Sequence, residues 1–187
     1  MISELDFKNE LIRKLSVEKG WIDGDKEISD GKKVDILNHR KKVAIEVKDD
    51  TVHKSEMPSP ERPIICTTTD IGRMNKILSD HIKKARIKFK KYSDYKTILL
   101  IRTEHRIMDT VRYAIDGLHT YTQTSYIGRR GKYSEHTREN IGCYIICDSD
   151  GGLHYIPNPH CKFSENLVSK REAEDILEQS LDEIREV

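Results

Sequence analysis

The sequence has few cysteines and no long hydrophobic run. No stretch of its 187 residues reaches the about 18 consecutive apolar residues of a membrane-spanning helix. The first ten residues, MISELDFKNE, are charged where a secretory signal is apolar. Four widely spaced cysteines, at 66, 143, 147 and 161, do not suggest a disulfide framework. We therefore expect a soluble, cytoplasmic protein with reduced thiols, no membrane association and no small-molecule cofactor.

The sequence also lacks a strong overall charge, because 33 basic and 32 acidic residues give a net charge of +1. The balance hides an uneven distribution. Residues 165–187 hold eight acidic and three basic residues, which leaves 30 basic and 24 acidic residues, a charge of +6, in the rest of the chain. A length of 187 residues favours a single domain, 1–187, with a substantial core.

Hydrophobic periodicity predicts an α/β protein in which a mixed sheet is flanked by helices. The expected helices are 4–19, 71–91, 104–118 and a last one whose start has the capping-box pattern Ser169-Lys170-Arg171-Glu172 and whose buried stripe includes Leu181 and Ile184. The expected strands are a hairpin over 33–49 with a turn at 38–41, then 64–68, 95–101, and a C-terminal hairpin over 141–147 and 153–156. Trp21-Ile22 either begins a short strand or packs against its neighbours, and 51–63 and 119–140 are expected loops.

The hairpin over 33–49 places charged residues among alternating apolar ones. Asp35 lies in the first strand, and Glu46 and Lys48 lie in the second. With an even-membered turn, we expect Asp35 opposite Ala44 and diagonal to Glu46, on one face, and Val34, Ile36, Val43, Ile45 and Val47 on the other. Two carboxylates at this spacing suit Mg²⁺, or Mn²⁺, which binds one or two carboxylates together with waters and substrate phosphate. The Lys48 ammonium would then orient a water or stabilise negative charge.

Together with Glu10 on the first helix, this pattern resembles the PD-(D/E)XK nuclease superfamily, which includes restriction endonucleases, Holliday-junction resolvases and repair nucleases. The matching residues are Glu10, Asp35 and Glu46-Val47-Lys48, although Val34 stands where many members have proline. The resemblance implies a restriction-endonuclease-like α-β-β-β-α-β core over 4–102, to which 103–187 add a helix, a polar loop, a hairpin and a last helix. It also implies that Asp35, Glu46 and the Val47 carbonyl hold Mg²⁺, that Lys48 assists the water, and that Glu10 supports the metal or substrate.

Two basic segments are candidates for contact with DNA phosphates. One is the helix 71–91, with Lys83, Lys84, Arg86 and Lys88; the other is the polar segment with Arg129 and Arg130. A solvated helix face explains the first equally well, and a plain loop is the preferred interpretation of the second.

The expected function is therefore that of a metal-dependent nuclease that hydrolyses phosphodiester bonds in DNA. The alternative is a non-catalytic nucleic-acid-binding or protein-interaction module, in which Asp35, Glu46 and Lys48 form a solvated face with a cross-strand ion pair. A zinc site from Cys143, Cys147, His154, His160 and Cys161 is disfavoured, since the pair at 143 and 147 is not spaced like a zinc-binding turn. A homodimer is a further hypothesis, with the 141–156 hairpin or the last helix as interface.

Overall fold

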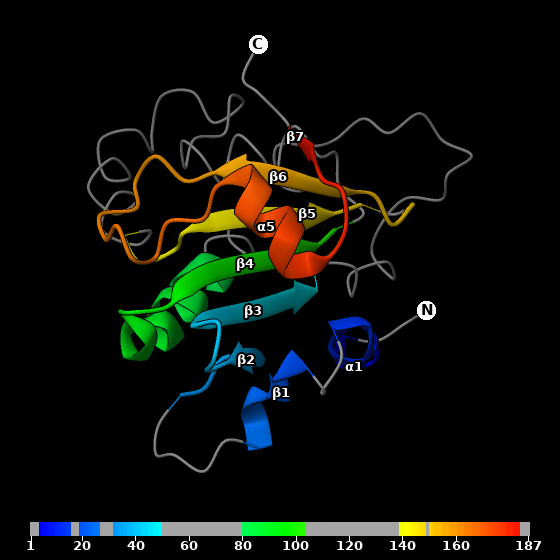
Figure 1. Ribbon diagram of the computed structural model, residues 1–187, viewed down its shortest axis with the longest axis horizontal. Coiled ribbons are helices and arrows are strands. Elements are labelled where there is room, and N and C mark those ends of the chain that lie inside the picture. Colours follow the sequence, from blue (N-terminus) through cyan, green and yellow to red (C-terminus); the bar gives the residue numbers. More distant parts are fainter. Residues whose placement is uncertain are drawn as a thin grey trace.

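A computed structural model describes residues 4–15, 19–26, 32–49, 80–103, 139–148 and 150–183. These residues form an α/β fold around one mixed sheet of seven strands, which lie side by side in chain order (Figure 1). The strands are β1 Ile22–Asp23, β2 Ile36–Asn38, β3 Val43–Asp49, β4 Lys96–Arg102, β5 Cys143–Cys147, β6 Leu153–Pro157 and β7 Asp182–Glu183.

The centre of the sheet is parallel and its sides contain antiparallel pairs. β3, β4 and β5 run parallel, with Glu46 beside Leu99 and Leu99 beside Tyr144. β1 with β2, β2 with β3, and β5 with β6 are antiparallel, and β7 runs parallel to β6. β4 is buried on both faces, as its nearly continuous apolar sequence predicts.

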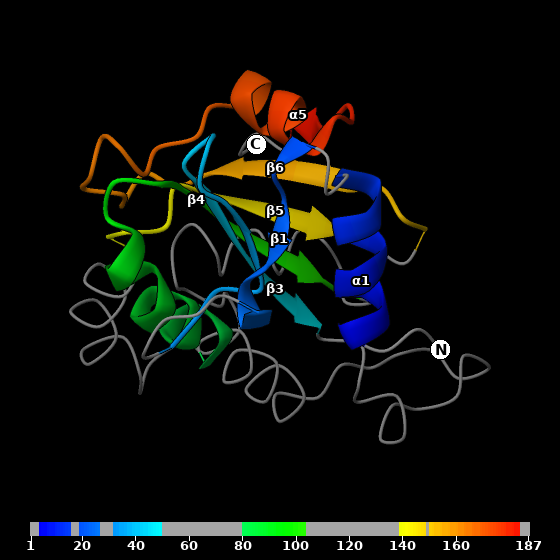
Figure 2. The same ribbon diagram turned by 60° about the horizontal axis from the view of Figure 1, so that its bottom comes forward.

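Helices cover both faces of the sheet (Figures 1 and 2). α1 (Glu4–Leu15) and α5 (Lys170–Leu177) pack on the face that carries Ile45, Val47 and Leu100. The opposite face, with Ala44, Leu99 and Tyr144, is covered by the helical residues 80–89, which continue into the 3₁₀ helix η4 (Lys90–Tyr92). A second short 3₁₀ helix, η2 (Gly24–Lys26), follows β1.

The hairpin register confirms the even turn and corrects its position. Asn38 pairs with Val43, so the loop is 39–42 and has four residues. The predicted pairing of Asp35 with Ala44 is wrong, because Leu37 pairs with Ala44 and Ile36 with Ile45. Continuing the same register places Asp35 opposite Glu46 rather than diagonal to it.

The predicted face of Val34 is also wrong, since its side chain belongs to the same core cluster as Leu37 and Ala44. Strand alternation does not extend back to this residue, because β2 begins at Ile36. The backbone at Asp35 instead accepts a hydrogen bond from Gly24 N (3.0 Å). A Cβ on Gly24 would lie 1.9 Å from the Val34 carbonyl oxygen, so this close approach requires glycine.

The last helix has the predicted capping box but ends earlier than expected. The Ser169 side chain accepts from Glu172 N, and the Glu172 carboxylate accepts from Ser169 N. Glu178 then adopts a left-handed conformation (φ 55°), which ends the helix. Leu181 is therefore buried from the connection to β7, not from the helix.

Several predicted elements lie outside the described residues: the strand 64–68, the helix 104–118, almost all of the loop 119–140, and residues 71–79 of the second helix. α1 is described to Leu15, and residue 184 also lies outside. None of the helices in the described ranges is long and apolar enough to cross a membrane.

Candidate active site

Asp35, Glu46 and Lys48 come together beneath the helix 80–89. Glu46 and Lys48 are two residues apart on β3, so both side chains project to the face that this helix covers. Asp35 lies just before β2, on the strand antiparallel to β3. The hairpin thus brings the two carboxylates to the same part of the sheet.

Short contacts join these three residues. The Lys48 Nζ lies 2.6 Å from Glu46 Oε1 and 3.7 Å from Asp35 Oδ2. Asp35 Oδ2 also accepts a hydrogen bond from Val47 N (2.8 Å), which holds the carboxylate against β3. The Val47 carbonyl accepts from Lys48 Nζ (2.7 Å), so the ammonium lies among all three predicted oxygen ligands.

A second lysine, Lys88, reaches the same carboxylates from the covering helix. Its Nζ lies 2.7 Å from Glu46 Oε1 and 3.4 Å from Asp35 Oδ1. We had expected Lys88 among exposed phosphate contacts, but its side chain is only 22% exposed. The sequence contains a signal for this position, because Lys88 lies three residues after the buried Ala85, on the flank of the helix that faces the sheet.

Burial changes the protonation of Glu46. Its side chain is 0% exposed, and neither carboxylate oxygen has a well-aligned hydrogen bond among the described residues. Burial raises the pKa of Glu46 to about 7, and the neighbouring Asp35 carboxylate adds to this rise, while Lys48 and Lys88 oppose it. The alternative of a solvated charged face is therefore wrong for this cluster.

His81 lies farther along the same helix. The helix ends near the start of β4, whose Lys96 pairs with Val43, so the helix runs antiparallel to β3. Two turns back from Lys88, about 10 Å along the axis, His81 reaches the carboxyl end of β3. Both ring nitrogens are buried without a described hydrogen-bond partner, and burial, aided by the charges of Lys48 and Lys84, lowers the pKa of His81 to about 4. The ring is therefore neutral at pH 7.

The structure does not bring Glu10 to this cluster. α1 packs on the opposite face of the sheet, and Glu10 pairs with Lys14 one turn along the helix (3.3 Å). Lys8, on the other side of α1, forms ion pairs with Asp23 (2.7 Å) and Asp25 (2.6 Å) at the β1 end of the sheet. Glu10 consequently faces away from the hairpin, because residues two apart on a helix point in nearly opposite directions.

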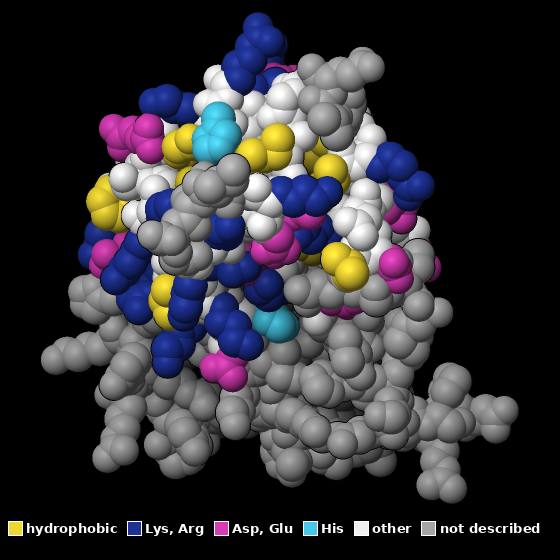
Figure 3. Space-filling view, turned by 90° about the horizontal axis from the view of Figure 1, so that it is seen from below, with side chains coloured by type: hydrophobic (Ala, Val, Ile, Leu, Met, Phe, Trp, Pro, Cys, Tyr) yellow, Lys and Arg dark blue, Asp and Glu magenta, His cyan; other side chains and the backbone are white. Residues whose placement is uncertain are grey.

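The other predicted nucleic-acid contacts are placed only in part. Lys83 and Lys84 are exposed on the helix 80–89, and Arg86 is half-buried; Arg129 and Arg130 lie outside the described residues. Further exposed basic residues are found in the β2–β3 turn and at the end of the helix: Arg40, Lys41, Lys42, Lys90 and Lys91. Figure 3 shows Lys and Arg side chains gathered on this side of the molecule, interspersed with Asp and Glu.

The donor set fits a hard divalent cation better than a soft one. Two carboxylates and a backbone carbonyl are oxygen ligands of the kind that Mg²⁺ and Mn²⁺ bind. The well-buried carboxylate of Glu46, whose oxygens lack aligned hydrogen bonds, has coordination capacity to offer. Within the described ranges, no group of three or more His, Cys, Asp or Glu side chains is placed to hold a metal. Cys143, Cys147 and Cys161 are free thiols.

No protein-family model, no curated protein and no solved structure matches this chain.

Proposed function

We propose that this protein is a metal-dependent nuclease that hydrolyses phosphodiester bonds in DNA. The observation that supports this proposal is the convergence of Asp35, Glu46 and Lys48, with two ammonium groups against two carboxylates in a buried cluster. Buried charges are costly to maintain, and strongly shifted pKa values gather at functional sites.

The order of the described elements also supports the proposal. α1, β1, β2, β3, the helix 80–89 and β4 follow one another as in the α-β-β-β-α-β core of the PD-(D/E)XK superfamily. In this assignment β1, rather than the predicted strand 64–68, is the first of the three strands. Asp35 then lies at the start of the second strand, and Glu46 and Lys48 lie on the third.

The proposed reaction assigns a role to each member of the cluster. Asp35, Glu46 and the Val47 carbonyl would hold Mg²⁺, which supplies charge neutralisation at a phosphoryl oxygen and a lower pKa for water. Lys48, 2.6 Å from Glu46, is placed to orient the attacking water and to stabilise negative charge on the phosphate. Lys88 adds a second positive charge that the sequence pattern does not assign, and Glu10 has no role.

Plasmid cleavage in Mg²⁺ or Mn²⁺ tests the proposal. Asp35→Asn, Glu46→Gln and Lys48→Met should each lower the cleavage rate by about 100-fold or more. Lys88→Met should lower it as well, since its ammonium contacts both carboxylates. Matched controls change members of exposed ion pairs, Asp94→Asn, Glu178→Gln and Lys19→Met, and should cleave like the wild type.

Circular dichroism and thermal unfolding establish that each variant is folded. Cleavage that persists in all four site variants would disprove the assignment. A wild type that binds DNA with a steep salt dependence and never cuts would instead establish the non-catalytic binding module.

The homodimer remains a hypothesis. The apolar side chains of β5 and of α5 are buried within the chain, so neither of the predicted interfaces presents them. The exposed large hydrophobic residues of the described ranges are Leu5, Phe163 and Leu167. Light scattering coupled to size-exclusion chromatography measures the oligomeric state directly.

A further inference from the structure

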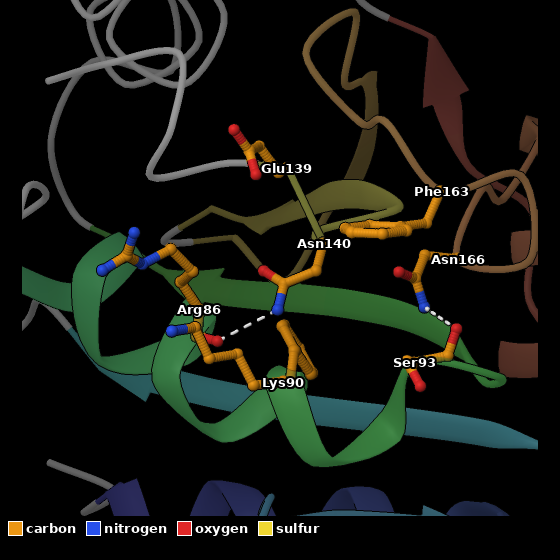
Figure 4. Close-up of a pocket in the computed structure, with 8 residues that line it drawn as sticks. Arg86, Lys90, Ser93, Glu139, Asn140, Phe163 and Asn166 are labelled. Atoms are coloured by element: carbon orange, nitrogen blue, oxygen red, sulfur yellow. Dashed lines mark hydrogen bonds between the residues drawn. The ribbon is translucent and has the colours of Figure 1, made fainter. Parts of the chain in front are cut away.

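A small cavity opens on the other flank of the helix that covers the active site. Its volume is about 240 Å³, below the range of roughly 300–1,000 Å³ of pockets that enclose drug-sized ligands. Arg86 and Lys90 line it from the helix side, Glu139 and Asn140 from the segment before β5, and Phe163 and Asn166 from the connection between β6 and α5 (Figure 4). The size suits a single flat ring system rather than a whole cofactor.

Two buried amides present hydrogen-bond acceptors at this cavity. Asn166 is 0% exposed, and its Nδ2 donates to the carbonyls of Tyr95 (2.6 Å), Tyr92 (3.2 Å) and Ser93 (3.3 Å). Asn140 is 6% exposed, and its Nδ2 donates to the Arg86 carbonyl (3.1 Å). These bonds fix the orientation of both amides, so each Oδ1 is the remaining acceptor.

Neither acceptor is satisfied by the protein in the described ranges. Asn140 Oδ1 and Asn166 Oδ1 are buried and have no hydrogen-bond partner there. Buried polar atoms are nearly always paired, so an unpaired acceptor at a cavity indicates a donor that comes from a ligand. Two such acceptors select a ligand with more than one N–H or O–H donor.

An aromatic ring and positive charge complete the site. Phe163 is 44% exposed although it is large and apolar, and it lines the cavity beside both amides (Figure 4). Arg86 and Lys90 place cationic side chains at the cavity, while Glu139 is paired with Lys162 (2.9 Å). An aromatic face, edge acceptors and neighbouring cations are the groups that bind a base and its phosphate in single-stranded nucleic acids.

We infer that this cavity binds an unpaired nucleobase, which stacks on Phe163 and donates hydrogen bonds to Asn140 and Asn166. Guanine is the expected preference because its Watson–Crick edge offers two adjacent donors, N1–H and the N2 amino group. Both donors are engaged in a duplex, so the base must be single-stranded or flipped out. The inference rests on the proposed nucleic-acid substrate and deepens it.

The position of the cavity relates it to the active site. Lys88 extends from one flank of the helix to Asp35 and Glu46, and Arg86 and Lys90 lie on the other flank. A helix with its side chains is about 10 Å across. A strand that crosses the helix therefore places one base in the cavity and a neighbouring phosphodiester near the carboxylates.

The test measures binding in EDTA, so that it does not depend on cleavage. Fluorescence anisotropy compares labelled nine-residue oligothymidylates whose central position is guanine, inosine or an abasic site. For the wild type we expect guanine to bind about 5- to 150-fold more tightly than the abasic site. Inosine, which lacks the N2 amino group, should fall between them.

Variants at exposed positions separate base binding from general affinity. Phe163→Ala should reduce the ratio between guanine and abasic affinities to about one, and Phe163→Trp should preserve it. Leu167→Ala is the matched control, since Leu167 is 45% exposed and does not line the cavity.

Equal binding of guanine and abasic oligonucleotides by the wild type, or no binding of either, would overturn the inference. So would a ratio that is unchanged in Phe163→Ala. Base-dependent binding without plasmid cleavage would retain the cavity and reject the nuclease. Cleavage without base dependence would do the opposite.

Discussion

At the scale of single residues, the active-site cluster combines groups that disfavour their own charged forms. Glu46 is fully buried beside Asp35, and its pKa is raised to about 7. His81, two helical turns from Lys88, has its pKa lowered to about 4 by burial and by nearby lysines. Both groups contribute to stability in a way that depends on pH, and with opposite signs.

The free energy of unfolding of Glu46→Gln, relative to the wild type, should rise by about 3 kcal/mol between pH 4.5 and 7.5. In this window native Glu46 binds more protons than the unfolded chain, so wild-type stability from this residue falls as pH rises, while glutamine is unaffected. Urea unfolding at both pH values measures the difference.

His81→Gln provides the control of opposite sign. Between pH 4 and 6.5 the unfolded chain binds more protons than native His81, so the wild type gains stability as pH rises. Any advantage of His81→Gln should therefore shrink over this range. Parallel pH profiles for the two variants would contradict the burial that we assign to these residues.

At the scale of elements, chain termination and close backbone approaches position both sites. The cavity depends on Asn166, whose backbone carbonyl accepts from Thr97 N (3.2 Å) and whose side chain holds the end of η4. Gly142 permits this arrangement, because a Cβ there would lie 1.8 Å from the Asn166 carbonyl oxygen. The connection from β6 then leads into the capping box of α5.

Ser169→Ala should lower the free energy of unfolding by about 1 kcal/mol, because the Glu172 backbone N–H loses its acceptor. Glu172 also pairs with Lys96 at the start of β4, so the cap anchors α5 to the sheet. Ser164→Ala is the matched control, since Ser164 is exposed and its hydroxyl bonds only to Glu165 in the described contacts. Equal urea midpoints for the two variants would show that the cap contributes nothing.

At the scale of the whole molecule, charge is distributed so that a nearly neutral chain has a basic side. The acidic residues concentrate near the C-terminus, in and after α5, whereas the helix 80–89 and the β2–β3 turn expose lysines and arginines (Figure 3). The active-site cluster and the cavity lie on the two flanks of that same helix. A polyanion bound to the basic side would contact both.

Replacing Lys83 and Lys84 together with glutamine should weaken single-stranded DNA binding and reduce the slope of log affinity against log salt by about 1.5. Each lost phosphate contact releases fewer counterions, whatever the base sequence. The control pair Lys170→Gln and Arg171→Gln lies on α5, which covers the opposite face of the sheet. An unchanged slope for the first pair, or an equal change for both, would exclude the helix 80–89 from the binding surface.

The sequence by itself determined the alternation of the hairpin, the buried strand β4, the capping box of α5 and the candidacy of Asp35, Glu46 and Lys48. These depend on local patterns of two to four residues, which the chain carries whatever its partners. Only the tertiary structure decided that Lys88 joins the carboxylates, that Glu10 lies across the sheet, that Val34 changes face and that Leu181 leaves the helix. Each of these depends on which face of the sheet a helix covers, or on where a strand begins or a helix ends. Contacts between residues far apart in sequence set those positions, and no local pattern records them.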